Sequence, residues 1–178
     1  MGSASRTPGI WLSMRWDSVG DLNCSVARTL AIVGERWTML ILRDAFLGHR
    51  RFDDFQNGTG IARNILSARL RALVANGILE RVKAEGEVGR IEYRLTKKGI
   101  DLYPVVVAML KWGDTWLADE HGPPLTLIHR TCGARTTPVM VCPQCGQHIV
   151  ARDMVAIPRR PAHHVHRPAR GSSRQASR

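Results

Sequence analysis

Three of the four cysteines in this 178-residue chain stand close together in its last third, next to a histidine. His129 and Cys132 form one half of a repeated pattern, and Cys142 and Cys145 form the other. Each pair encloses two residues and is followed by glycine, and nine residues separate Cys132 from Cys142. Thiolate sulfur and imidazole nitrogen are favoured zinc ligands, and four of them close a tetrahedral structural site. The sequence therefore predicts a Cys3His zinc site without an open position for hydrolytic chemistry.

Other interpretations of these residues remain open. Cys142 and Cys145 could form a thioredoxin-like redox pair, although no βαβ pattern surrounds them. The segment could also be a ribbon that binds no metal. His148 is a reserve ligand in the second half of the pattern. Zinc is the favoured cofactor, because a short segment with few apolar side chains gains little stability from a core and a metal can supply it.

The fourth cysteine, Cys24, stands apart, at the start of a predicted helix. A helix N-terminus favours the thiolate, which is the form of cysteine that oxidants attack. Cys24 is therefore a possible redox sensor. The alternative is a small buried side chain that packs in the core.

The charge of the chain points to a polyanionic partner. There are 26 Lys and Arg against 15 Asp and Glu, a net charge of +11. The excess divides into +5 over 24–118 and +6 over 156–178, while 1–23 and 119–155 are neutral. A basic chain of this kind favours nucleic acid ahead of a membrane surface.

Several classes of protein are disfavoured. No apolar run approaches the roughly 20 residues that span a membrane, and no apolar segment at the start resembles a signal peptide. We therefore expect a cytoplasmic protein with no membrane partner. We also expect no enzyme, since there is no Ser/His/Asp arrangement, no credible carboxylate pair and no phosphate-binding glycine loop.

The apolar pattern predicts a mostly α protein with a small β-hairpin (α+β). Helices are expected over 25–33, 36–47 and 61–76, with room for a short helix over 52–56 and a turn over 57–60. Strands 78–83 and 91–95 flank a loop that contains glycine. Thr96 can cap a last helix that runs to about 117, and Pro104 perturbs its first turns. This order is that of a winged helix-turn-helix, whose second helix of the turn enters the major groove.

The helix over 61–76 has two unlike faces. Leucines and Val74 line one arc, whereas short polar side chains and arginines line the other. An ordinary amphipathic surface helix would explain this alone, but the hairpin that follows favours DNA binding. Arg90 at the hairpin tip can reach the DNA backbone or minor groove. The predicted DNA-binding residues are Arg63, Asn64, Ser67, Arg71 and Arg90.

The last helix has a wide apolar stripe, which favours a dimer interface over simple core packing. A two-fold dimer would match an inverted-repeat operator in double-stranded DNA. The predicted interface residues are Leu102, Val106, Met109, Trp112 and Trp116.

Five segments agree in order and spacing with one known family: CSVAR at 24–28, VGERWTMLILRD at 33–44, GHRRF at 48–52, GIARNILSARL at 60–70 and EYRLT at 92–96. They resemble the HxlR-type branch of the MarR-like winged-helix transcription regulators over about 24–116. The resemblance implies a homodimeric bacterial DNA-binding regulator. One departure is Ala62, where many members have a serine that caps the recognition helix, and Thr59 is the expected substitute. Some members carry a similar appendix after the last helix.

The predicted organisation has four parts: an irregular leader over 1–22, a winged helix-turn-helix domain for DNA binding and dimerisation over 23–118, a zinc-ribbon-like segment over 119–155, and a disordered basic tail over 156–178. The expected function is a dimeric, sequence-specific transcriptional regulator that represses by occupying a promoter. Thiol oxidation or a small ligand could control it. The alternative is a winged-helix and zinc-ribbon adaptor for protein–protein contacts that does not bind specific DNA.

Overall fold

The computed structural model of the chain describes residues 16–84, 86 and 89–157. The chain forms two units. One contains the described residues up to Ala31 together with those from Val155 on, and the other runs from Ile32 to Met154. The start of the predicted leader, 1–15, and nearly all of the predicted basic tail, 158–178, lie outside the described residues.

The first unit contains a 3-10 helix, Trp16–Asp21, and most of helix α1, Ser25–Val33. The prediction of an irregular leader over 1–22 is therefore wrong for its last residues. Helix α1 has the predicted range. Its apolar side chains Val26 and Leu30 are exposed, so helical spacing here does not imply burial.

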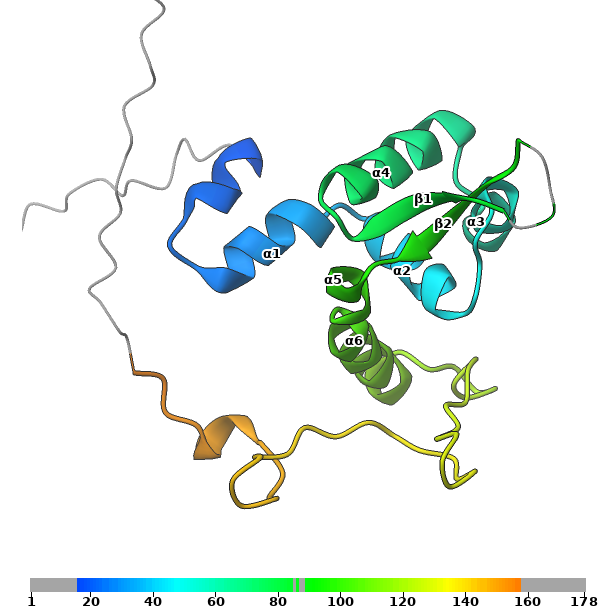
Figure 1. Cartoon of the computed structure of the whole chain (residues 1–178). Coiled ribbons are helices and arrows are strands. Elements are labelled where there is room, and N and C mark those ends of the chain that lie inside the picture. The colour runs from blue at the N-terminus through cyan, green and yellow to red at the C-terminus, as the bar shows by residue number, and fades with distance from the viewer. Residues whose placement is uncertain (1–15, 85, 87–88, 158–178) are drawn as a thin grey trace, which may run out of the picture. The chain divides into compact units, whose positions relative to one another are not determined.

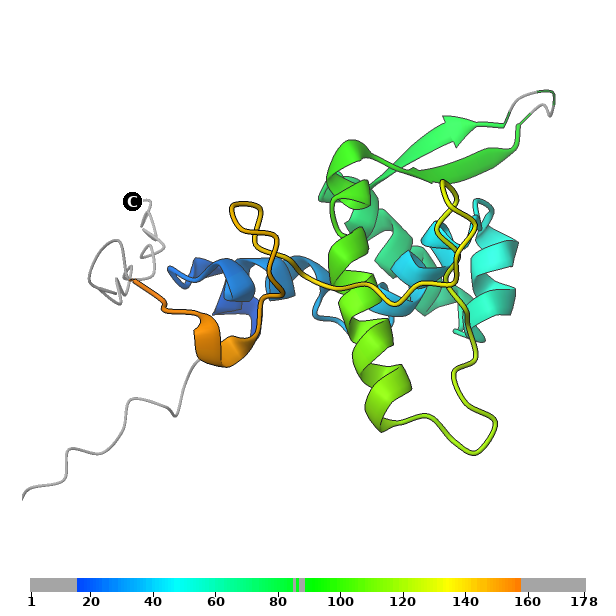
Figure 2. The ribbon, with the colours of Figure 1, turned by 90° about the horizontal axis from the view of Figure 1, so that it is seen from below.

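The second unit contains three helices, a hairpin and two further helices, followed by a segment that includes a short 3-10 turn (Figures 1 and 2). Strands β1 and β2 pair antiparallel, with Leu79 opposite Leu95 and Lys83 opposite Ile91. Figure 2 shows the hairpin projecting beyond the helices. The elements are α2 (Thr38–Phe46), α3 (Phe52–Thr59), α4 (Arg63–Ala75), β1 (Leu79–Lys83), β2 (Ile91–Leu95), α5 (Lys97–Ile100), α6 (Tyr103–Trp116) and a 3-10 turn (Ala151–Asp153).

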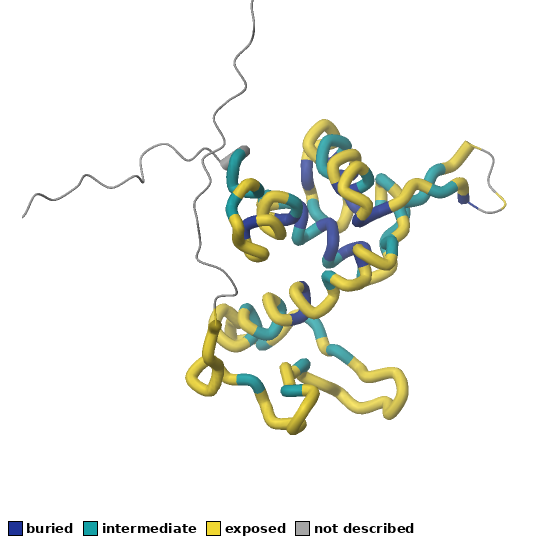
Figure 3. The backbone as a smooth tube through the Cα atoms, turned by 60° about the vertical axis from the view of Figure 1, so that its left-hand side comes forward, coloured by how far each residue is buried: buried dark blue, intermediate teal, exposed yellow. Residues whose placement is uncertain are grey.

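The core of this unit lies where α2, α3, α4, the start of the hairpin and α6 meet (Figure 3). The three leucines on the inner face of α4 are almost fully buried, as their spacing predicts. Leu47, by contrast, follows the end of α2 and is exposed. The core side chains include Ile41, Leu42, Phe55, Leu66, Leu70, Leu73, Ile78, Leu79 and Val106.

Three predicted boundaries from α2 to α4 are wrong. Helices α2 and α4 start at Thr38 and Arg63, each two residues later than expected. The segment 57–60, predicted as a turn, continues α3 to Thr59, and only Gly60 leaves the helix, with φ 67°. That left-handed conformation suits glycine, which has no Cβ to clash.

The predicted helix over 96–117 is in fact two helices. Thr96 caps α5 as its position suggests, since its Oγ1 accepts a hydrogen bond from the Gly99 N–H at 3.1 Å. The helix then breaks at 101–102, and α6 begins at Tyr103 with Pro104 in its first turn. Proline has no N–H to donate and its ring clashes with the carbonyl four residues earlier, so Pro104 disfavours one regular helix and suits the first turn of α6.

A buried carboxylate joins α2 to α3. Asp44 is 1% exposed and accepts a hydrogen bond from Arg43 Nε at 2.7 Å. Arg43 also donates through Nη2 to the Gly58 carbonyl on α3, at 3.2 Å. The same side chain therefore neutralises the buried charge and binds the end of the next helix. Arg43 and Asp44 thus help to fix the position of α3 relative to α2, and α4 follows α3 in the chain.

Candidate nucleic-acid interface

Helix α4 presents one core face and one outer face. Its inner face is Leu66, Leu70 and Leu73, and burial of these side chains locks the rotation of the helix. The side chains of Asn64 and Arg71 consequently lie in solvent. Ser67 and Ala68 on the same outer face are half-buried. A helix fixed in this way can carry short polar groups and arginine to the base edges of a groove.

The start of α4 lacks a side-chain cap. Ala62 occupies the N-cap position and makes no capping hydrogen bond. Thr59, the expected substitute, is committed elsewhere: its Oγ1 donates to the Phe55 carbonyl at 2.7 Å and accepts from the Ile61 N–H at 3.4 Å. The predicted substitution is therefore wrong. The first amides of α4 have no cap from this side chain, and amides at a helix N-terminus suit a phosphate.

Arg63 is held against α3. Its Nη1 donates to Gln56 Oε1 at 2.9 Å and lies 3.3 Å from Asp53 Oδ1. Its guanidinium carbon lies 4.7 Å from the centre of the Phe52 ring. The side chain is still 68% exposed. Arg63 therefore has a defined direction, with part of its charge offset by Asp53.

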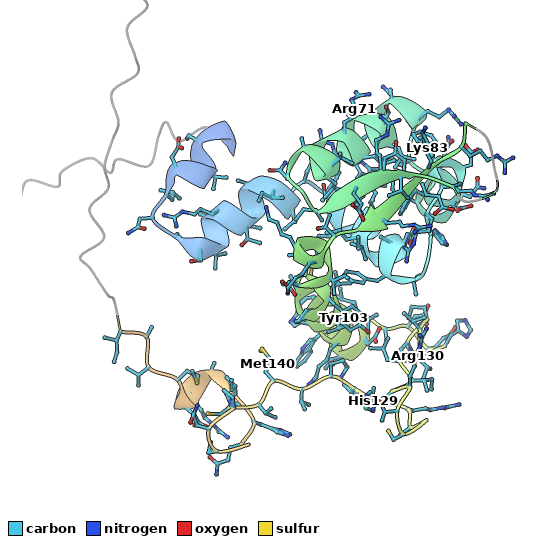
Figure 4. The ribbon with its side chains drawn as sticks, viewed as in Figure 1. Arg71, Lys83, Tyr103, His129, Arg130 and Met140 are labelled. Carbon is cyan, nitrogen blue, oxygen red and sulfur yellow. The ribbon has the colours of Figure 1, made fainter. Side chains whose placement is uncertain are left out.

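The hairpin carries basic side chains that the sequence analysis did not single out. Arg81 and Lys83 point to the same face of β1 as Leu79. Leu79 reaches the core, but the outer half of the hairpin extends past it, so Arg81 and Lys83 are exposed. Figure 4 labels Lys83 on the hairpin and Arg71 on α4. Arg90, the predicted wing residue, is also exposed at the start of the return to β2.

Other basic residues of the same stretch are occupied within the protein. Arg69 lies 3.8 Å from Glu35, and Arg94 Nη2 lies 2.9 Å from Glu92. Lys98 Nζ donates to the Asn76 carbonyl at 2.8 Å, at the C-terminal end of α4. Part of the positive charge counted in the sequence is therefore paired or hydrogen-bonded within the chain.

The predicted dimer residues fall into two groups. Val106 is 9% exposed, and Leu102 packs against the same core. Val106 belongs to the inside of this chain, so its assignment to an interface is wrong. Leu102 is partly buried, and its assignment stays a prediction. Met109, Trp112 and Trp116 are 55%, 59% and 71% exposed, and they form an apolar strip along α6.

The four predicted zinc ligands form two separate pairs. His129 Nδ1 lies 3.2 Å from Cys132 Sγ. Hydrogen bonds from the backbone N–H groups of Cys145 and Gln144 lower the pKa of the Cys142 thiol. In the described part of the chain, which contains all four ligands, no three His, Cys, Asp or Glu side chains converge closely enough to hold a metal ion. The zinc site therefore stays a prediction at this point.

Cys24 lies directly before α1 and its thiol is exposed and not in a disulfide. The interpretation as a small buried residue is therefore wrong. Its predicted role as a redox sensor stays a prediction.

Three helices followed by an antiparallel hairpin, with a polar outer face on the third, define a winged helix-turn-helix protein. Residues 32–121 match the family model of the HxlR-like helix-turn-helix, and the chain belongs to this family. The family is one of DNA-binding transcription regulators, which is not an enzyme class. Within the described residues, no helix is long and apolar enough to cross a membrane.

Similar proteins agree with this assignment. An uncharacterised HTH-type transcriptional regulator of Mycobacterium tuberculosis, Rv3095, is 47% identical over 134 residues, which cover 75% of this chain and 85% of that one. The crystal structure of PA1607, described as a candidate transcription factor, is 38% identical with a TM-score of 0.72, covering 80% of this chain and 99% of that one. PA1374 of Pseudomonas aeruginosa is 37% identical with a TM-score of 0.53, covering 78% and 94%. The predicted winged helix-turn-helix fold and the predicted family are confirmed, and the zinc-ribbon-like segment stays a prediction.

Proposed function

We propose that this chain acts as a cytoplasmic homodimer that binds an inverted-repeat operator in double-stranded DNA and represses the promoter it occupies. The observation that carries the proposal is the outer face of α4. Three buried leucines fix its rotation, and Asn64 and Arg71 extend from the opposite side. Amide and guanidinium groups match the hydrogen-bonding edges of adenine and guanine in the major groove.

The wing supplies contacts of a different kind. Arg81 and Lys83 are exposed on β1, beyond the core. Positive side chains on a projecting hairpin contact phosphates, and such contacts add affinity without reading sequence. We assign sequence preference to α4 and salt-sensitive affinity to the wing.

The dimer is proposed from α6. Trp112 and Trp116 are four residues apart and Met109 stands three residues before Trp112, so the three lie on one side of the helix. Large apolar side chains exposed together favour association. A second copy of this chain presents the same strip, and a two-fold pairing of identical strips repeats α4 symmetrically. Repeated recognition helices require half-sites roughly 10 base pairs apart, centre to centre.

The test is selection of bound duplexes from a random pool at two salt concentrations. The full chain is compared with a variant in which Arg63, Asn64 and Arg71 are alanine. We expect an inverted repeat to be enriched by the full chain at the higher salt, and the variant to lose it. If both proteins enrich nothing, or if both enrich the same repeat, the assignment to α4 is wrong. Unchanged binding of the variant to every DNA pool would favour the adaptor instead.

A further inference from the structure

The segment after α6 contains two turns with the same backbone structure. In the first, the His129 N–H donates to the Ala134 carbonyl at 2.9 Å. The Gly133 N–H donates back to the His129 carbonyl at 2.8 Å, and Gly133 has φ 70°. The turn therefore closes over four residues and ends at a glycine in the left-handed region, where a Cβ would be strained.

The second turn repeats these bonds thirteen positions later. The Cys142 N–H donates to the Gln147 carbonyl at 2.8 Å, and the Gly146 N–H donates to the Cys142 carbonyl, also at 2.8 Å. Gly146 has φ 71°. The donors, the acceptors and the left-handed glycine of the second turn all stand thirteen positions after those of the first. The two turns are therefore structural copies of each other.

The arms that enter and leave the turns also agree. Thr136 N–H donates to the Leu127 carbonyl at 2.9 Å, and Ile149 N–H donates to the Met140 carbonyl at 2.9 Å. One isolated bridge closes each pair of arms, Ile128 with Arg135 and Val141 with His148. Each copy is thus a short hairpin with the same register.

In each turn, the side chains of the first and fourth residues are the two candidate metal ligands. In the first copy these are His129 and Cys132, whose ring nitrogen and sulfur lie 3.2 Å apart. In the second copy they are Cys142 and Cys145. The backbone N–H groups of Gln144 and Cys145 donate hydrogen bonds to the Cys142 sulfur, so the second turn closes around this sulfur. A turn of this kind supplies two of the four ligands of a tetrahedral ion.

We propose that His129, Cys132, Cys142 and Cys145 of one chain bind a single zinc ion, and that the ion brings the two turns together into a ribbon. The eight residues 134–141 connect them. Of these, only 137–139 lie outside the bonded arms of the two hairpins. A loop of three residues lets a chain reverse direction. The connection can therefore place both ligand pairs around one ion, whose bonds to nitrogen and sulfur are about 2.0–2.3 Å long.

The arms of the first turn lie beside α6, and the second turn can pair with the first turn there. Leu127 and Thr136 of its arms line a hollow with Lys111 and Thr115 of α6. The second turn has its apolar side chains in solvent, with Val139, Met140 and Val141 each exposed by about half or more. Pairing of the turns around the ion covers part of this apolar surface, which adds to the stability from the metal bonds.

The test is the zinc content of the full chain, purified without a histidine tag and measured by plasma mass spectrometry after gel filtration. We expect one zinc per chain. His129→Ala, Cys132→Ser and Cys145→Ser remove ligands from both turns, and each should lower the zinc content at least tenfold. Cys24→Ser and His148→Ala are matched controls outside the four positions, and both should keep one zinc per chain.

Circular dichroism of each variant checks that the helices remain, so that metal loss reflects the site itself. Cobalt substitution gives a second readout, because tetrahedral cobalt with thiolate ligands absorbs visible light. Zinc-free protein whose thiols are reduced and which takes up no cobalt would overturn the proposal. Zinc loss in Cys145→Ser alone, with His129→Ala and Cys132→Ser unaffected, would overturn the joint site. Half a zinc per chain would overturn a site within one chain.

Discussion

Arg71 Nη1 donates a hydrogen bond to Ser67 Oγ, 2.7 Å away and one turn earlier on the outer face of α4. The hydroxyl of Ser67 therefore holds the guanidinium along the helix axis. A guanidinium held in one direction loses less conformational entropy when it binds a base edge. This relationship makes Arg71 the most sharply defined candidate for base recognition on the helix.

Replacement of Arg71 by alanine should reduce sequence preference. We expect a loss of about 1–3 kcal/mol in binding to the selected operator, with little change for random duplex, because a bidentate contact to guanine is lost. Fluorescence anisotropy with both duplexes measures the two affinities. Ser67→Ala is the comparison, and it should cost less because the arginine remains. An equal loss on operator and random DNA would assign Arg71 to phosphate contact instead.

Removal of wing charge should act through salt dependence. Arg81→Ala and Lys83→Ala should each lower the slope of log affinity against log salt by about one, on operator and random DNA alike. Arg94→Ala is the matched control on the same hairpin, because Arg94 is already paired with Glu92 at 2.9 Å. Titrations at four salt concentrations give the slopes. If Arg94→Ala changes the slope as much as Lys83→Ala, the ion pair with Glu92 does not keep Arg94 from the DNA, and the assignment of the contact to Arg81 and Lys83 is wrong.

The apolar strip on α6 should control association of the chain. Trp112 is 59% exposed, so Trp112→Glu should leave the fold of the monomer intact while it weakens the proposed dimer at least tenfold. Sedimentation equilibrium measures the dimer constant. Val106→Ala is the contrasting change, since Val106 is 9% exposed and its truncation should lower the free energy of unfolding by about 1–2 kcal/mol. A dimer that survives Trp112→Glu unchanged would remove α6 from the interface.

The junction of α2 and α3 should not tolerate a methyl group at Gly58. A Cβ there would overlap the Asp44 carboxylate and press against the His49 ring. Gly58→Ala should therefore lower the free energy of unfolding by about 1–3 kcal/mol, measured by urea denaturation. Asn57→Ala changes the exposed neighbour on the same helix and should alter stability by less than about 0.5 kcal/mol. If Gly58→Ala and Asn57→Ala change the free energy of unfolding equally, the residues around Gly58 accommodate the methyl group, and the predicted clash is wrong.

Much of the fold could be predicted because its signals are local. Leu66, Leu70 and Leu73 recur at helical spacing, and their burial followed that spacing. The alternation over 91–95 predicted the strand β2 with its bounds. Thr96 was predicted as a cap from its own position and side chain, and it caps α5. Each of these signals depends on residues within a few positions of one another, and such residues meet in any structure that contains the element.

The wrong predictions are of two kinds. Some depend on contacts between residues that are distant along the chain, and others depend on where a helix ends. Pro104 was predicted to perturb a helix, but the complete break at 101–102 depends on where the chain turns to pack. Val106 belongs to the same stripe as Met109, yet only Val106 meets the core. The charge count over 24–118 included Lys98, whose ammonium donates a hydrogen bond to the Asn76 carbonyl, 22 positions away.

The amino-acid sequence by itself determined the winged helix-turn-helix, its family and the identity of the possible metal ligands, because periodicity, turn residues and ligand spacing are properties of neighbouring positions. Only the tertiary structure decided which basic side chains project into solvent, as with Lys83, and which are hydrogen-bonded within the chain, as with Lys98. It also revealed that the His129 and Cys142 turns share one backbone pattern. The physical reason is that exposure and pairing depend on which distant segments lie against a residue, and chain spacing does not encode that directly.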